Sequence, residues 1–141
     1  MKANELRIGN YVNYYFPPFD IFEENHQIES GGDIQVCINY PDAMESIPLT
    51  EEWLLKFGFI GKTDSMGDRR YYVDCYQHEI MYIFENGDFY GGYLNDNMVM
   101  NSEGVCGIKH VHQLQNLFYA LMGEELSLHK QSLNATDKAQ E

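Results

Sequence analysis

The sequence has few basic residues. Its 141 residues include 9 Lys and Arg against 22 Asp and Glu, which gives a formal net charge of −13 at pH 7. A protein that binds nucleic acid without sequence preference neutralises phosphates with Lys and Arg side chains. The shortage of cations therefore argues against direct contact with nucleic acid.

Long apolar runs and paired cysteines are also lacking. No stretch approaches the roughly 20 apolar residues of a transmembrane helix, and the first residues do not resemble a secretory signal. Cys37, Cys75 and Cys106 are odd in number and widely spaced, whereas extracellular disulfide scaffolds use an even, denser set. We therefore expect reduced thiols, no membrane partner and a cytoplasmic protein.

The sequence does contain enough apolar residues for a core. Hydrophobic residues make up 44% of the chain and aromatic residues 14%, which excludes wholesale disorder. The length is typical of one domain. We expect a compact α+β domain over residues 1–126, divisible into a β-rich part at 1–48 and a helix–strands–helix part at 49–126. Residues 127–141 are polar and aperiodic, and are predicted to be disordered.

The N-terminal pattern favours β-structure. Residues 5–15 are predicted to form a strand that is interrupted at Gly9-Asn10. Gly31-Gly32 is a turn signal within residues 27–40, and the apolar residues after it alternate with polar ones, as in a half-buried strand. We expect a curled antiparallel sheet or a small SH3-like barrel here.

Two helices are predicted, at residues 48–58 and 111–122. Thr50 is a good N-cap for the first, because its hydroxyl can accept a hydrogen bond from a first-turn N–H. Gly58 and Gly123 are suited to the left-handed conformation that ends a helix. In the second helix, Val111, Leu114, Phe118 and Leu121 recur at helical spacing, which predicts an apolar stripe packed on a sheet.

An antiparallel meander is predicted between these helices. Its strands are expected at about 70–76, 79–84, 89–94, 98–100 and 105–109, by the spacing of apolar and turn residues. Asn86-Gly87 is the strongest turn signal, since both residues tolerate positive φ. The second helix is expected to pack across this sheet.

The motifs that could carry chemistry are weak. Gly61-Lys62-Thr63 resembles the end of a phosphate loop, but Lys56 stands where that motif needs glycine. Cys106, His110 and His112 lie close in sequence, yet no Cys-x-x-Cys pair accompanies them as in a zinc site. No serine or cysteine has a nucleophile-type neighbourhood. We therefore expect no catalytic residue, metal or cofactor, and favour a noncatalytic protein.

An aromatic segment runs from residue 14 to residue 22. Aromatic side chains beside Pro17-Pro18 offer a large contact area at modest entropic cost, as interface anchors do. The alternative is that the segment folds back to cover a small sheet. The candidate binding residues are Tyr14, Tyr15, Phe16, Phe19, Phe22, Glu23 and Glu24.

Acidic residues are concentrated near this segment. Between Arg7 and Lys56 there is no Lys or Arg, while nine acids occur there. One interpretation is a solvated surface that maintains solubility. The other is an acidic face that attracts a basic protein partner, or that imitates the charge of DNA.

Three segments, Glu5–Val12, Ile47–Phe59 and His110–Leu126, resemble a family of small, largely uncharacterised proteins of gut-bacterial genomes, phages and other mobile elements. The resemblance implies a cytoplasmic accessory protein and supplies no catalytic residues. Our first hypothesis is an acidic noncatalytic adaptor of phage or mobile-element origin that acts by protein contact. The alternatives are a binder of a small molecule such as a nucleotide or sugar, a small hydrolase, and a DNA-mimic inhibitor of a nucleic-acid enzyme.

Overall fold

The structure of the protein is a computed structural model. It describes residues 1–16, 20–63, 65–67, 69–75, 78–85, 88–94, 99–101 and 108–128. The predicted Asn86-Gly87 turn, most of the predicted strand at 105–109 and most of the predicted disordered tail lie outside these ranges. The architecture is mixed α+β with antiparallel sheets and a C-terminal helix, as predicted.

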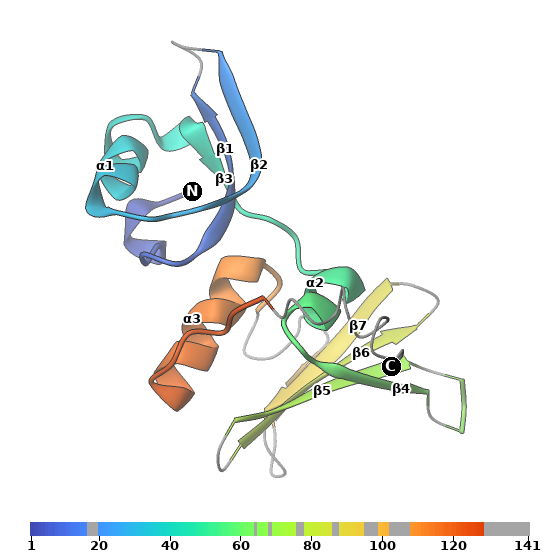
Figure 1. Ribbon diagram of the computed structural model, residues 1–141. Helices are drawn as coiled ribbons and strands as arrows, with labels where there is room; N and C mark the ends of the chain where they lie inside the picture. Colours follow the sequence, from blue (N-terminus) through green and yellow to red (C-terminus); the bar gives the residue numbers. More distant parts are fainter. Residues whose placement is uncertain are drawn as a thin grey trace, which may run out of the picture.

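The N-terminal part of the chain is an open antiparallel sheet covered on one face by a helix (Figure 1). The strands have the order β2-β1-β3, and β1 pairs antiparallel with both neighbours. Its elements are the 3-10 helix η1 (Ala3–Glu5), β1 (Tyr11–Phe16), β2 (Ile21–Gln27), α1 (Gly31–Asn39), the 3-10 helix η3 (Pro41–Ala43) and β3 (Met44–Glu45). The predicted N-terminal antiparallel sheet is therefore present, with three strands.

The strand predicted across residues 34–40 is wrong, because Gly31–Asn39 form helix α1. The Ser30 side chain accepts a hydrogen bond from the Gly32 N–H at 3.2 Å and caps the helix. Asp33 lies in the first turn, where a negative charge is favoured by the helix dipole. Gly31-Gly32 therefore begins a helix, and the predicted turn at this position is also wrong.

The second part of the chain is a five-stranded antiparallel sheet with one helix before it and one after it in the sequence, and both helices contribute to one core with the sheet. The sheet order is β4-β5-β6-β7-β8, which confirms the predicted meander and adds one strand, β4, that was not predicted. The elements are α2 (Glu51–Lys56), β4 (Ile60–Thr63), β5 (Arg69–Cys75), β6 (His78–Glu85), β7 (Asp88–Leu94), β8 (Val99–Asn101) and α3 (Val111–Met122).

The two predicted helices and their end signals are confirmed. The Thr50 hydroxyl accepts a hydrogen bond from the Trp53 N–H at 3.3 Å at the start of α2. Gly58, just after α2, has φ 90°, and Gly123, which ends α3, has φ 73°, so both positions favour glycine. Within the described ranges, no helix is both long enough and apolar enough to cross a membrane.

The apolar side chains form two separate core clusters. The larger joins α2 and α3 to the meander and includes Leu54, Ile80, Val111 and Leu114, each fully buried. Burying a side chain of this size contributes roughly 1.5–3 kcal/mol relative to leaving it exposed. The smaller cluster lies between β1, β3 and α1 and consists of Leu6, Val12, Ile28, Cys37 and Met44.

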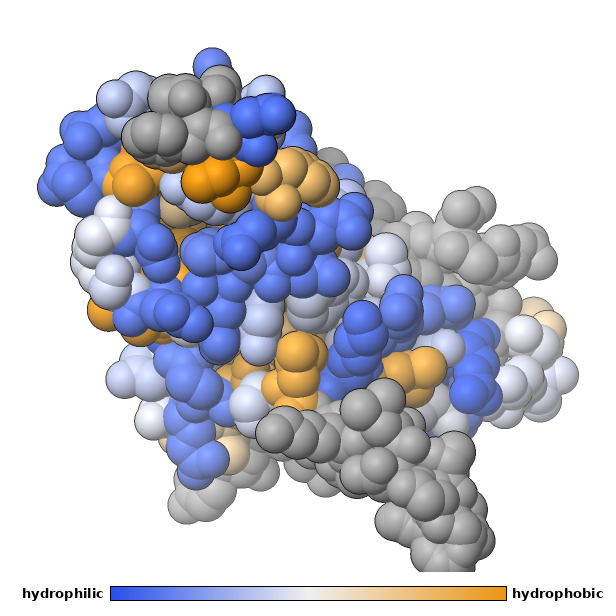
Figure 2. All heavy atoms as spheres, turned by 45° about the horizontal axis from the view of Figure 1, so that its top comes forward, coloured by the Kyte–Doolittle hydropathy of each residue, from blue (hydrophilic) through white to orange (hydrophobic). Residues whose placement is uncertain are grey.

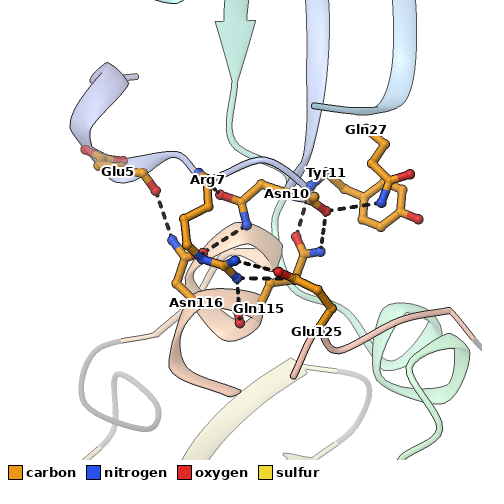
Figure 3. A network of polar contacts seen from close by, with 9 residues as sticks. Glu5, Arg7, Asn10, Tyr11, Gln27, Gln115, Asn116 and Glu125 are labelled. Carbon is orange, nitrogen blue, oxygen red and sulfur yellow. Dashed lines mark hydrogen bonds and ion pairs between the residues drawn. The ribbon is translucent and has the colours of Figure 1, made fainter. Parts of the chain in front are cut away.

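A polar network joins the N-terminal part to α3 (Figure 3). Arg7 Nε donates to Asn116 Oδ1 at 2.9 Å, and Arg7 Nη1 lies 2.6 Å from a Glu125 carboxylate oxygen. The buried Gln115 side chain accepts from the Tyr11 N–H and donates to the Gly9 carbonyl, both at 2.9 Å. These contacts hold the base of β1 against the helix, so the far end of β1 points away from the larger core (Figure 1).

Candidate functional site

The candidate binding residues lie on the β1–β2 hairpin, and the strand register places them on two faces. Tyr15 is directly opposite Phe22, and Tyr14 is opposite Glu23. Directly opposed residues share a face of the sheet, while successive residues point to opposite faces. Tyr15 and Phe22 therefore share the face away from α1, and Tyr14 belongs to the face that packs on α1.

The outer face carries an exposed aromatic pair. Tyr15 is 43% exposed and Phe22 is 60% exposed, and their ring centroids are 6.4 Å apart at an interplanar angle of 57°. The two rings contribute to the wall of a hollow of about 210 Å³. The residues that line this hollow are Asn13, Tyr15, Phe22, Asp42, Ala43 and Glu45.

The inner face holds the other aromatic candidates in contacts within the fold. The Tyr14 ring is 5.0 Å from the His26 ring, and the Phe16 ring is 5.2 Å from the Tyr40 ring, centroid to centroid. Burial, followed by the nearby charges of Asp33 and Glu23, raises the pKa of the Tyr14 hydroxyl above its ordinary value. Tyr14 and Phe16 therefore make contacts within the fold, and residues 14–16 and 21–22 of the segment are themselves in strands β1 and β2.

Two of the remaining candidates, Glu23 and Glu24, lie on the edge strand β2. Glu23 Oε1 lies 2.6 Å from His26 Nδ1. Glu24 is exposed beside a bulge, at which Asn25 has φ 57° and donates its N–H to Asn13 Oδ1. Phe19 lies outside the described residues. The structure thus brings Tyr15 of β1 and Phe22 of β2 together, and Glu23 and Glu24 follow Phe22 along β2.

Sequence reasoning missed two acids of the hollow, Asp42 and Glu45. Glu45 is opposite Asn13 in the β1–β3 pairing, and Asp42 lies in η3 just before β3. Both are exposed, and within the described part of the chain neither has an ion-pair partner. A two-residue strand gives no periodic signal, so this pairing was not visible in the sequence.

The two charged side chains that line the hollow, Asp42 and Glu45, are both acidic. Residues 8–55 contain no Lys or Arg, so the cations that the chain does have lie elsewhere. Four of them stack on aromatic rings of their own neighbourhood: Arg7 on Tyr119, Lys56 on Trp53, Lys62 on Tyr72 and Arg69 on Tyr71. Figure 2 shows apolar atoms near the top of the view, the end where Figure 1 places the β1–β2 hairpin, with hydrophilic atoms beside them.

The residues that were weighed as metal ligands do not form a site in the described part of the chain. No cluster of three or more His, Cys, Asp or Glu suited to a metal occurs there. His112 is buried and its Nε2 lies 3.3 Å from Glu5 Oε1, and Cys106 is outside the described residues. Cys37 is buried, and burial raises the pKa of its thiol, which keeps it protonated and unreactive.

Comparisons of the chain with protein-family models, with curated proteins and with solved structures found no match. The resemblance to small proteins of phages and mobile elements therefore stays a prediction.

Proposed function

We propose that this chain is a noncatalytic binding module that contacts a basic protein partner through the outer face of the β1–β2 hairpin. The observation that carries the proposal is the exposed Tyr15–Phe22 pair beside Asp42 and Glu45, in a stretch without Lys or Arg. Aromatic side chains that are exposed on a rigid element are typical of interface anchors.

Charge supports a basic partner rather than a neutral one. With a net charge of −13, the chain attracts positively charged molecules over a distance set by the salt concentration. Acids around an aromatic anchor raise the rate of encounter with a basic surface and disfavour acidic competitors. The accessory role that the family resemblance implies is compatible with such a module.

The size of the hollow favours a protein partner over a small molecule. Pockets for cofactors and drug-sized ligands measure about 300–1,000 Å³ and enclose most of the ligand. The hollow here measures about 210 Å³ and lies on an exposed sheet face. It fits a side chain that projects from a larger surface better than it fits a nucleotide or a sugar.

The test is capture of a partner from the cells that encode the protein. Tagged wild-type protein and the variant Tyr15→Ser/Phe22→Ser are used as baits at about 50 mM and about 500 mM salt. We expect the wild type to retain a basic protein at low salt and to lose it at high salt. The double variant is expected to lose it at both.

The control bait is Ile60→Ser, which removes an exposed apolar residue of β4. It should retain the partner as the wild type does. The proposal fails if no basic protein is retained at low salt, or if the hairpin variant and the wild type retain the same proteins in equal amounts.

A further inference from the structure

We infer that the hollow beside Tyr15 and Phe22 receives a single arginine side chain of the basic partner. This inference rests on the proposed function, since it specifies which group of that partner is recognised. It is built on the residues of the outer face, which combine aromatic rings and carboxylates around a volume of side-chain size.

The two rings offer faces to a planar cation. With centroids 6.4 Å apart and planes inclined by 57°, Tyr15 and Phe22 form an angled wall rather than a closed stack. A guanidinium group attracts the negative face of an aromatic ring and also stacks on it through its own flat surface. Both rings are on neighbouring strands of the same sheet, so their spacing is fixed by the ladder.

The acids supply the charge that an arginine needs. Asp42 and Glu45 line the same hollow from η3 and β3. Neither has an ion-pair partner among the described residues. Asn13 adds a polar side chain to the wall, although its Oδ1 already accepts a hydrogen bond from Asn25.

The chain itself binds an arginine in this way at another place. The Arg7 guanidinium carbon lies 4.3 Å from the centre of the Tyr119 ring, while Arg7 Nη1 contacts Glu125 at 2.6 Å. A ring face and a carboxylate thus hold one guanidinium group between them. The hollow presents the same two kinds of group, and residues 8–55 contain no Lys or Arg to occupy it.

Arginine is preferred to lysine for a geometric reason. A guanidinium group can stack on a ring and donate hydrogen bonds in its plane at the same time, toward a carboxylate at the edge. An ammonium group is a compact, strongly hydrated charge that loses more hydration on entering an aromatic wall. The hollow offers both a wall and acids, and so uses both properties of arginine.

The experiment uses three capped peptides with the sequence Gly-Ser-Gly-X-Gly-Ser-Gly, in which X is arginine, lysine or citrulline. Citrulline keeps the shape of arginine and removes its charge. Each peptide is titrated into the isotope-labelled full chain and followed by NMR. We expect the arginine peptide to shift the signals of Tyr15, Phe22, Asp42 and Glu45 together, with a single saturation curve, and to bind about tenfold more tightly than the citrulline peptide.

Two charge-matched variants separate the hollow from the general acidity of the chain. Asp42→Asn/Glu45→Gln removes two charges at the hollow, and Glu29→Gln/Glu124→Gln removes two exposed charges elsewhere. The first is expected to weaken the arginine peptide about tenfold, and the second to change its affinity less than twofold. Phe22→Ser, at a largely exposed position, is expected to weaken it as well.

The inference is overturned if the arginine and citrulline peptides bind equally, if lysine binds as tightly as arginine, or if the two double variants lose the same affinity. The proposed function stands despite these results if capture of the cellular partner is still lost in the Tyr15→Ser/Phe22→Ser variant. The opposite result is also informative. If the arginine peptide binds at the hollow, but the Tyr15→Ser/Phe22→Ser variant captures the same partner as the wild type, the proposed function is overturned and the inference is retained.

Discussion

Thr50 stabilises the start of α2 through one hydrogen bond. Its hydroxyl accepts from the Trp53 N–H, and Trp53 is a buried member of the larger core. We expect Thr50→Ala to lower the free energy of unfolding by about 1 kcal/mol, because an N-cap oxygen is lost. Thr50→Ser keeps the oxygen and should be close to wild type. Urea denaturation measures both, and equal losses in the two variants would contradict a capping role.

Protonation of His112 makes the free energy of unfolding depend on pH. Burial lowers the pKa of His112 below its ordinary value of 6.5, although its contact with Glu5 opposes this and the nearby His110 adds to it. The unfolded chain therefore binds this proton more readily than the folded chain does. The contribution of His112 to stability is constant well above pH 6.5 and falls as the pH is lowered through 6.5 toward the folded-state pKa.

His112→Gln is expected to make the free energy of unfolding less dependent on pH between pH 7 and pH 5. The matched control is His26→Gln, at a half-buried position that leaves His112 in place. Chemical denaturation across this pH range measures both slopes. An unchanged slope in His112→Gln would show that other groups govern the acid sensitivity.

At the scale of elements, the junction between β1 and α3 depends on Gln115. Its fully buried side chain accepts a hydrogen bond from the Tyr11 N–H and donates one to the Gly9 carbonyl. Gln115→Met keeps the length of the side chain and removes both hydrogen bonds. We expect a loss of about 2 kcal/mol in the free energy of unfolding, because a buried donor is left without its acceptor.

The comparison for this change is Gln35→Met, on the exposed side of α1, where the side chain donates to Asn39. Thermal and urea unfolding should place Gln35→Met within about 0.5 kcal/mol of wild type. Similar losses in the two variants would mean that the junction contributes little.

Helices α2 and α3 could be predicted from the sequence, and α1 could not. In α2, the N-cap, the apolar spacing and the terminal glycine agree, and in α3 the apolar spacing and the terminal glycine agree. In α1, β-branched residues at alternate positions mimic a strand, although Ile34 and Ile38 are also one helical turn apart. The better signal was Ser30 followed three residues later by Asp33, a spacing typical of a helix start. Asp33 Oδ2 accepts from the Glu29 N–H at 2.9 Å.

Of the residues that line the hollow, the sequence indicated the two aromatic ones and not the two acids. Tyr15 and Phe22 belong to one aromatic segment, and their composition alone indicated a contact surface. Asp42 and Glu45 join them through the β1–β3 pairing, which depends on α1 returning the chain to the sheet. Since α1 was predicted as a strand, no sequence argument placed these acids beside the rings.

At the scale of the whole molecule, the two core clusters stabilise different parts of the chain. The larger cluster stabilises the meander with its two helices, and the smaller one fixes α1 beneath the N-terminal sheet. The polar junction at Arg7 and Gln115 joins them. Among the described residues, Tyr15 and Phe22 on the outer face of the hairpin stay partly exposed, and the nearby Asp42 and Glu45 are acidic.

The most direct test of a contact function is hydrogen–deuterium exchange on the full chain, alone and with the basic partner obtained by capture. The account predicts slower exchange in the segments 11–16, 21–27 and 42–45 upon binding. The meander and the exposed side of α3 should exchange as they do in the free protein. Protection confined to residues 69–94 or to α3, with the hairpin unchanged, would contradict the account.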